Sequence, residues 1–241
     1  MMADSLRDPR SLGEDELVAY LVSLPAHGRS RREWLKAVQA FWRWWSHRSE
    51  VPDPSARLRL RAPVARPPDI LTPEQVRALV RAAFRAEERR GWAVLLQAST
   101  GLCIGSLVAL RREDVHPEEG WLWTTAAKGG RMYRVELSRP ARIAAAHLLA
   151  IPPRGQARQQ TLLGVGHEAY RRWLRRAAES AGLGRVWPHL LRHTFGSALA
   201  AVADPRSWQA AMGHTDLSQY ARYAHPDARR VAAAVEAARV M

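Results

Sequence analysis

The chain has 241 residues, 47% of them hydrophobic, and its 37 lysines and arginines against 23 acidic residues give a formal net charge of +14. This apolar content is ample for a folded core and argues against a wholly disordered chain. No apolar run approaches the roughly 18 residues of a membrane span, the opening MMADSLRDPR lacks the apolar stretch of a signal peptide, and a single cysteine excludes an internal disulfide and a multi-cysteine zinc site.

We therefore expect a soluble cytoplasmic protein, and its positive charge points to a polyanionic partner. A surplus of this size attracts phosphate backbones and speeds encounter with nucleic acid. A GC-rich or thermophilic composition bias is the alternative source of the charge. Such a bias contributes, because every basic residue except Lys36 and Lys128 is an arginine.

The first part of the chain has the pattern of a small helical domain. Apolar residues at helical spacing over residues 14–24 predict a first helix that ends before Pro25. A second helix is predicted from Ser30 to about residue 48, with Ser30 as its N-cap and Glu33 in the capping-box position.

Two faces of this second helix differ in chemistry. One face is an apolar stripe rich in aromatic residues. Its helical period favours packing into a core, and stacking on nucleic-acid bases is the alternative. The stripe consists of Trp34, Leu35, Val38, Phe41, Trp42 and Trp45. The opposite face is basic and suited to phosphates, and it carries Arg31, Arg32, Lys36, Arg43 and Arg48.

Residues 51–68 (VPDPSARLRLRAPVARPP) have no amphipathic period. Four arginines and five prolines predict an extended basic linker. We place the domain boundary here, with a helical domain over residues 1–62, a linker over 63–70 and a second domain over 71–241. Arg61 and Arg66 are further candidates for phosphate contact.

The second domain is predicted to be mainly helical with one small antiparallel sheet. Thr72 is the expected N-cap of its first helix, with Pro73 at the first helical position and Gln75 closing a capping box. Further helices are predicted over 90–99, from Ile104, over 139–149 and 168–181, and from 188 onward with breaks at 203–205, 213–218 and 225–226. The stretch WLWTTAAKGGRMYRVEL predicts a β-hairpin with Lys128 near its tip.

A small set of polar residues in this domain suggests chemistry at a phosphodiester. His189 and Arg192 share one helix face at i and i+3. His214 follows a glycine between two helical segments, and Tyr223 lies nine residues farther on. With Lys128, these side chains supply positive charge, proton donors and a hydroxyl nucleophile, which attack on a phosphodiester requires. Each residue alone would more often be structural.

The order of these motifs resembles that of the tyrosine recombinase, or phage integrase, family. The matching stretches are TGLCIGSLVALRREDV, AAKGGRMYRVEL, HLLRHTFGSAL and MGHTDLSQYARYAHP. The resemblance covers nearly the whole chain. It implies an α+β fold, mainly α, in which a helical core-binding domain precedes the catalytic domain, with double-stranded DNA as partner and no metal or other cofactor. It further implies a bacterial, phage or mobile-element origin.

The resemblance also assigns roles to residues. Tyr223 matches the nucleophile that becomes 3′-phosphotyrosyl-linked, and Arg192 matches the second catalytic arginine, a bidentate clamp on the phosphate. His189 and His214 match two histidines that bind the phosphate or shuttle protons. Lys128 matches the general acid for the leaving 5′-hydroxyl; lysine suits this role because arginine holds its proton too tightly.

The family pattern breaks directly after T-G-L, where its first arginine is expected. Cys103 stands at that position, and Ser106 replaces the acidic residue three positions later. Losing a preorganised charged donor costs about 3 kcal/mol or more of transition-state stabilisation. Arg111 and Arg112 are poor substitutes, because a continuous helix would place them roughly 12 Å away along its axis.

Three explanations of Cys103 stay open. The chain binds DNA or a partner recombinase without cutting, or it cleaves with another residue such as Arg131 or Arg134 in place of the arginine, or the cysteine is an engineered substitution. Loss of the acidic residue as well favours natural drift. Arg131 is also a candidate for DNA contact, together with Arg31, Arg32, Lys36, Arg43, Arg61 and Arg66.

The functional hypotheses follow from these alternatives. The first is a DNA-binding recombinase homologue with impaired or absent strand cleavage, the second an active site-specific recombinase, and the third a DNA-binding regulator that reuses the fold. Tyr220 is a second tyrosine three residues before Tyr223, but its spacing from His214 favours a packing role. The alanine-rich tail, residues 227–241, is expected to form a helix that docks on a neighbouring protomer on DNA or packs within its own chain.

Overall fold

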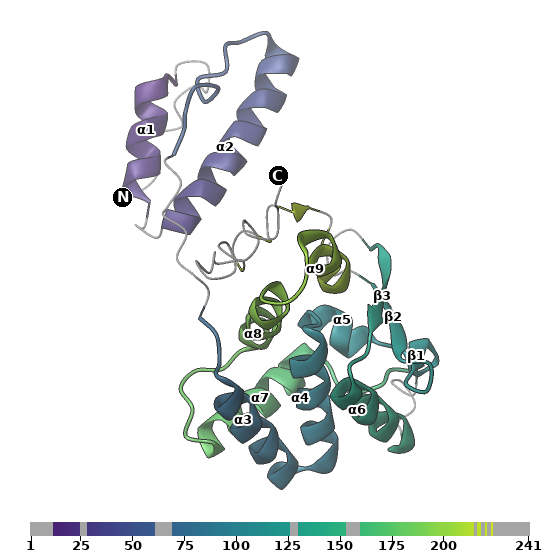
Figure 1. Cartoon of the computed structure of the whole chain (residues 1–241). Helices are drawn as coiled ribbons and strands as arrows, with labels where there is room; N and C mark the ends of the chain where they lie inside the picture. The colour runs from purple at the N-terminus through teal and green to yellow at the C-terminus, as the bar shows by residue number, and fades with distance from the viewer. Residues whose placement is uncertain are drawn as a thin grey trace, which may run out of the picture. The chain divides into compact units, whose positions relative to one another are not determined.

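The computed structural model describes residues 12–24, 28–60, 69–125, 130–152, 160–214, 216, 217, 220 and 223. The chain separates into two compact units, residues 1–65 and 66–241, which are described here one at a time (Figure 1). The described residues are mainly helical with one three-stranded antiparallel sheet, which confirms the predicted fold class. Among them, no helix combines the length and the apolar character needed to cross a membrane.

The first unit contains helices α1 (Glu14–Ser23) and α2 (Gly28–Ser49). Leucines on one face of α1 pack against α2 and the segment that follows it, and the buried members of this core are Leu17, Leu21, Leu35, Trp42 and Leu58. The prediction of Ser30 as N-cap is wrong, because α2 begins two residues earlier and Ser30 lies inside it.

The aromatic stripe of α2 is buried only in part. Trp42 is buried and Trp45 is half-buried, whereas Trp34 and Phe41 each keep 46% of their surface exposed. A helical residue advances roughly 100° around the axis, which puts Trp34 and Phe41 at the edge of the stripe rather than at its centre. The prediction that all six residues form the core is therefore wrong for these two.

Residues 51–60 are not an extended linker. The Gln39 side-chain amide on α2 donates to the backbone carbonyls of Ser55 and Leu58, both at 3.1 Å. Ser55 is fully buried and Leu58 belongs to the core of the unit. The arginines and prolines of this segment suggested a linker, so its packing through Ser55 and Leu58 was not predicted from the sequence. The rest of the predicted linker up to Pro68, including Arg61 and Arg66, lies outside the described residues.

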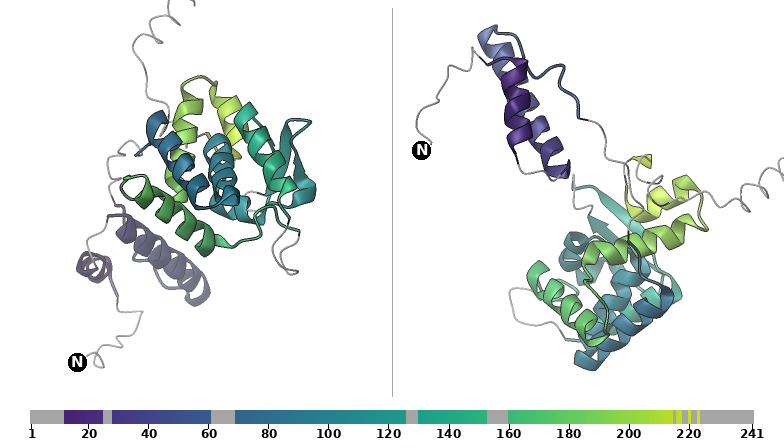
Figure 2. Two further views of the ribbon diagram at one scale, coloured as in Figure 1. Left: turned by 90° about the horizontal axis from the view of Figure 1, so that it is seen from below. Right: turned by 90° about the vertical axis from the view of Figure 1, so that its left-hand side faces the viewer.

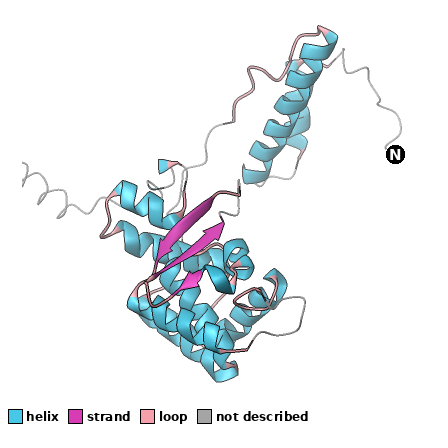
Figure 3. Cartoon of the chain, turned by 90° about the vertical axis from the view of Figure 1, so that its right-hand side faces the viewer, coloured by secondary structure: helices cyan, strands magenta, loops and turns pink. Residues whose placement is uncertain are grey.

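The second unit combines helices with a small sheet. Its elements are α3 (Pro73–Ala86), α4 (Glu88–Thr100), α5 (Ile104–Ala109), β1 (Val115–His116), β2 (Trp121–Thr125), β3 (Met132–Glu136), α6 (Arg139–Ala150), α7 (His167–Ser180), α8 (Pro188–Ala200) and α9 (Pro205–Met212). The strands are ordered β1-β2-β3 and lie at one side of the helices (Figure 3). The predicted capping box at the start of α3 is confirmed, since Thr72 and Gln75 bond each other's backbone N–H groups.

Helix α4 lies among the other helices of this unit (Figure 2). Its side chains contribute to both large cores of the unit. Its Leu96 packs among residues of α5, the sheet and α6, while its Val94 packs among residues of α3, α7 and α8. A helix buried on opposite sides needs apolar residues around most of its surface. Polar side chains are nevertheless buried on α4 at Arg89, Gln97 and Thr100, and one of them fixes the neighbouring loops.

That side chain is Gln97, which is completely buried. Its amide nitrogen donates to the Leu102 carbonyl at 3.0 Å and to the Pro188 carbonyl at 3.4 Å. Its amide oxygen accepts from the Tyr170 hydroxyl on α7 at 2.8 Å. Buried polar groups are stable only when they are hydrogen-bonded. Gln97 therefore holds the turn after α4 against the first residue of α8.

Replacing Gln97 with methionine should destabilise the protein by roughly 2–4 kcal/mol, because a buried hydroxyl and two carbonyls lose their partner at once. Urea unfolding followed by circular dichroism measures the change. Gln209→Met, at a half-buried glutamine on α9, is the matched control and should change the unfolding free energy by about 0.5 kcal/mol or less. Equal effects of the two variants would contradict this role of Gln97.

Candidate active site

The site begins at the turn that ends α4. Gly101 has φ of 63°, in the left-handed region, and a Cβ there would lie 2.4 Å from a ring carbon of Phe195 on α8. Glycine is therefore needed both for the backbone conformation and for the close approach of α8. The turn carries Cys103, which precedes the first residue of α5 and is half-buried.

Arg192 on α8 joins this turn to the end of α9. The guanidinium is 6% exposed and donates to the Gly101 carbonyl and to the Met212 carbonyl, each at 2.7 Å. A buried charge is tolerated only with such partners. Three segments that are far apart in sequence are thus held together by one side chain.

The same guanidinium approaches His214, with Arg192 Nη2 3.1 Å from His214 Nε2. A guanidinium can only donate, so Nε2 accepts and His214 carries its proton on Nδ1. Burial lowers the pKa of His214, and the charge of Arg192 lowers it further, while Asp216 acts in the opposite direction. His214 is therefore neutral at pH 7.

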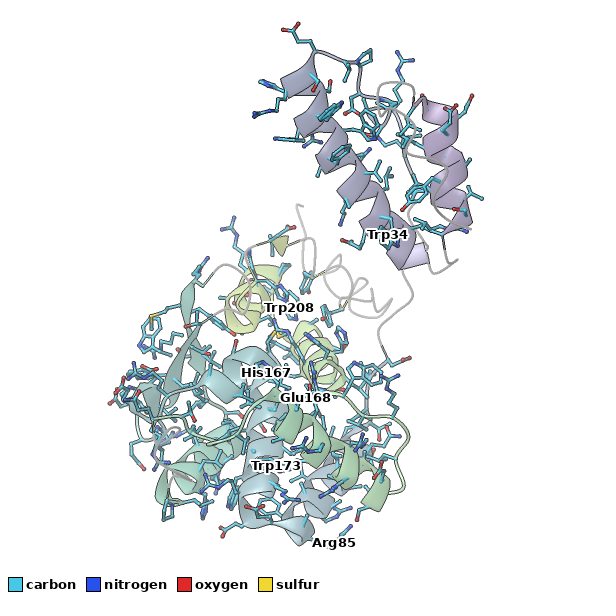
Figure 4. The ribbon with its side chains drawn as sticks, turned by 180° about the vertical axis from the view of Figure 1, so that it is seen from behind. Trp34, Arg85, His167, Glu168, Trp173 and Trp208 are labelled. Carbon is cyan, nitrogen blue, oxygen red and sulfur yellow. The ribbon has the colours of Figure 1, made fainter. Side chains whose placement is uncertain are left out.

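Trp208 on α9 supports the other face of His214. The two rings are stacked with centroids 5.2 Å apart and planes 3° apart. Trp208 is fully buried, and its indole N–H donates to the Gly196 carbonyl on α8 at 2.8 Å; Figure 4 labels its position in the second unit.

Tyr223 packs on the same indole. Its ring centroid lies 5.1 Å from that of Trp208, and the residue is only 7% exposed. Its hydroxyl lies 2.7 Å from His193 Nδ1, a hydrogen bond whose direction depends on the histidine tautomer. Tyr220, the other candidate tyrosine, meets Trp208 edge-on at 5.5 Å, which agrees with a packing residue.

His189 lies in the first turn of α8 and is exposed. Its ring centroid is 6.2 Å from that of His193. Partial burial lowers the pKa of His189, followed by the charges of Arg192 and Arg171. Next to it opens a pocket of about 730 Å³ lined by four arginines and two glutamates, and Glu168 and Glu179 pair with Arg171 and Arg175.

The described residues thus bring four of the five predicted site residues into one cluster, linked through His193 and Trp208. The fifth, Lys128, lies outside the described residues, as does the alanine-rich tail. The roles assigned to all five residues stay predictions.

Two residues of this cluster were not predicted from the sequence. His193 directly follows Arg192, and the second histidine of HLLRH was the signal for it. Tyr133 on β3 is the other. Its ring covers Gly213, where a Cβ would lie 2.4 Å from the ring. The two-residue period of the hairpin places Tyr133 on the same face as the buried Val135, and that alternation was the available signal.

The structure gives the alternative arginines other surroundings. Arg134 is exposed on the opposite face of β3, where it pairs with Glu136 at 2.7 Å. Arg131 is exposed before the strand. Helix α5 ends at Ala109 rather than continuing to Arg111, and Arg112 donates to backbone carbonyls at the end of α6.

Most predicted phosphate contacts on α2 lie together. Arg32, Lys36 and Arg43 are exposed and line a pocket of about 550 Å³, to which Arg59 also contributes. Their spacing of four and seven residues places them on one helix face. Arg31 is instead half-buried and donates to the Val22 carbonyl at 3.2 Å, which ties α2 to α1.

The chain is similar to known proteins over nearly its whole length. The family model described as "Phage integrase family" matches residues 69–230. Tyrosine recombinase XerD of Vibrio vulnificus is 30% identical in an alignment that covers 91% of this chain and 77% of that protein. Tyrosine recombinase XerA of Pyrococcus furiosus is 27% identical over 233 residues, which cover 94% of this chain and 81% of that protein.

Solved structures share the fold. The Tn1549 transposon integrase in complex with transposon right end DNA has a TM-score of 0.77 at 16% identity, covering 94% of this chain and 85% of that chain. The XerH site-specific recombinase bound to difH substrate has a TM-score of 0.72 at 16% identity, covering 94% of this chain and 71% of that chain.

Acid should weaken the folded state through His214. Because its pKa is lowered on folding, the unfolded chain binds the proton more readily. The stability that His214 contributes is complete above the ordinary histidine pKa of about 6.5 and is lost as the pH falls below it. We expect His214→Gln to flatten the decline of the unfolding free energy between about pH 7 and pH 5, measured by urea unfolding. His167→Gln, at an exposed histidine, serves as control, and a slope unchanged in His214→Gln would contradict the assignment.

Proposed function

The chain belongs to the phage integrase family, and on that basis we propose that it is a DNA-binding tyrosine recombinase homologue whose strand cleavage is impaired or absent. The observation that carries this proposal is the composition of the cluster around Arg192. A tyrosine hydroxyl, a guanidinium and imidazoles are assembled there, while Cys103 follows the T-G-L turn.

Duplex DNA is the proposed partner. The formal charge of +14 and the basic face of α2 both favour phosphate backbones. The Tn1549 integrase and XerH structures are described as complexes with DNA or substrate. We place the protein in the cytoplasm, where a bacterial cell keeps its DNA, and propose that it assembles there on DNA with further copies or with a partner recombinase.

Each residue has a proposed part in cleavage. A guanidinium has five N–H donors, and the contacts of Arg192 with Gly101, Met212 and His214 use three of them; we propose that a donor that remains binds the phosphate. Tyr223 would attack phosphorus and form the 3′-phosphotyrosyl bond as the 5′-oxygen leaves. His193 faces the tyrosine hydroxyl and is placed to accept its proton, and Lys128 is the proposed acid for the leaving 5′-oxygen.

The missing arginine argues for slow or absent cleavage. A phosphorane carries more charge than the ground-state phosphate, and fixed cationic donors stabilise that difference. A neutral cysteine cannot supply such a donor. The loss of about 3 kcal/mol corresponds to a rate roughly 100-fold lower.

An active site-specific recombinase is the second candidate function. The specific observation in its favour is the short contact between the Tyr223 hydroxyl and His193 Nδ1, at 2.7 Å. A site without selection for chemistry has no need of a base beside its nucleophile. The two candidates differ in one measurable product, the covalent protein–DNA adduct.

Adduct formation on a nicked suicide substrate, made from a DNA site that the protein selects from random duplexes, tests the proposal. We expect little or no adduct with the natural chain and an increase of about 100-fold with Cys103→Arg. Denaturing gel electrophoresis measures the product.

The tyrosine variants give this experiment its controls. Tyr223→Phe should abolish any adduct, and Tyr220→Phe, which removes a hydroxyl from a ring on the same indole, should leave it unchanged. Rapid adduct formation by the natural chain would overturn the impaired-cleavage proposal in favour of the active recombinase. Absence of adduct from Cys103→Arg as well would favour the regulator hypothesis.

Binding to duplex DNA should weaken steeply with salt, because basic side chains that neutralise phosphates release counterions. Between about 50 and 200 mM salt we expect a loss of affinity on the order of 10³-fold, measured by fluorescence anisotropy. Replacing Arg32, Lys36 and Arg43 together with glutamine should reduce the slope of log affinity against log salt by about 3. Salt-independent binding would contradict the DNA-binding proposal.

A further inference from the structure

Helix α2 of the first unit has an aromatic face that its core does not use. Trp44 keeps 55% of its surface exposed and Phe41 keeps 46%. Their ring centroids lie 6.2 Å apart, and the guanidinium carbon of Arg48 lies 6.0 Å from the centroid of the Trp44 ring. Trp34, which is also exposed, continues this face nearer the start of the helix (Figure 4). Aromatic side chains and arginine are the residues enriched where one protein binds another.

The aromatic face is not the one that suits duplex DNA. The basic residues Arg32, Lys36 and Arg43 lie together on a different face of α2. Each residue of a helix advances roughly 100° around the axis, so Phe41 lies roughly 160° from Arg43. A duplex bound to the basic face therefore leaves Phe41 uncovered. The bases of an intact duplex also stack on one another, whereas exposed aromatic rings stack on the bases of single strands. A protein surface is the better partner for this face.

Helix α1 carries a surface that complements it. Asp15, Val18 and Val22 lie within roughly 60° of one another around the helix axis. Val18 is 41% exposed, Val22 is 62% exposed, and Asp15 is exposed at the acidic start of the helix. Within one chain α1 packs on α2 through Leu17 and Leu21 instead. The valine face of α1 is therefore free to meet another molecule.

The spacing of the two surfaces agrees when the helices run antiparallel. Asp15 and Val22 are seven residues apart, and so are Phe41 and Arg48, which is roughly 10 Å along a helix axis in each case. An antiparallel pair brings the acidic first turn of α1 beside the basic last turn of α2. Asp15 of one copy then faces Arg48 of another, and the two valines face the aromatic rings between the ends.

We propose that the aromatic face of α2 docks on α1 of a second copy of this chain. Apolar contact between Trp44, Phe41 and the two valines forms the centre, and the pairing of Asp15 with Arg48 sets its direction. A second copy is the occupant because one chain carries both complementary surfaces. This inference rests on the proposed function only where that function includes assembly, and it needs neither cleavage nor any residue of the candidate active site.

Sedimentation velocity of the full-length chain without DNA, in about 0.15 M salt, tests the contact. We expect the natural chain to self-associate at micromolar concentrations. Trp44→Gln should weaken this self-association about 30-fold, as expected for an aromatic residue at the centre of an interface. Trp123→Gln, at a tryptophan of β2 that is 38% exposed, is the matched control and should leave it unchanged.

A charge exchange tests which surfaces meet. Asp15→Arg and Arg48→Glu should each weaken self-association about 10-fold, because each variant places like charges opposite one another. Mixing equal amounts of the two variants should restore it to within about 3-fold of the natural chain, since every contact between unlike variants again joins opposite charges. Misfolded variants would not recover on mixing. A natural chain that stays monomeric, or a mixture as weak as its parts, overturns the proposal.

DNA binding by the same variants separates this inference from the proposed function. Trp44→Gln should keep the salt-dependent binding to duplex DNA, because it leaves the basic face of α2 intact. Weaker binding of Trp44→Gln to single-stranded DNA with unchanged self-association would identify base stacking and overturn the docking. Self-association without binding to duplex DNA would support the docking and contradict the proposed function.

Discussion

The second unit depends on a buried positive charge that must be stabilised by hydrogen bonds to the backbone. Arg192 meets this requirement with the Gly101 and Met212 carbonyls, both at 2.7 Å. The turn after α4 and the end of α9 are therefore fixed relative to α8 by the side chain that also faces His214. Gln97 adds a neutral brace from the other side, because it bonds Leu102 beside the same turn and Pro188 at the start of α8. Stability and the candidate chemistry rest on the same atoms.

The absence of an arginine at position 103 affects the folded structure and the candidate chemistry differently. Ser106 leaves no unpaired hydroxyl in the interior, because it is buried and donates to the Thr125 carbonyl on β2. A cysteine and a serine are both neutral, whereas the family pattern has a cation and an acid. At these two positions the altered site has lost one positive and one negative group, so its net charge there is unchanged. What it lacks is charge directed at a ligand, which affects a transition state more than a folded chain.

Sequence patterns predicted the parts of this molecule that obey a local rule. The capping box of Thr72, the hairpin and the clustering of His189, Arg192, His214 and Tyr223 all followed from spacing. Prediction failed where tertiary contacts decide. Gln39 recruits residues 51–60 into the first core, and no local pattern announces that. Trp34 and Phe41 share a helical period with Trp42 but lie at the margin of the stripe. Tyr133 was missed because its importance comes from Gly213, which is 80 residues away in sequence.

Trp208 contacts both His214 and Tyr223, and this shared packing bears on why both residues are kept. One indole stacks on His214 and packs against Tyr223, and both side chains help to cover it. A substitution of either would expose a large buried aromatic surface and lower stability. Purifying selection for a folded DNA-binding protein would thus retain both residues even in a lineage that no longer cuts DNA. The presence of this pair is therefore what a shared core alone would produce, and it does not by itself show that the chemistry is under selection.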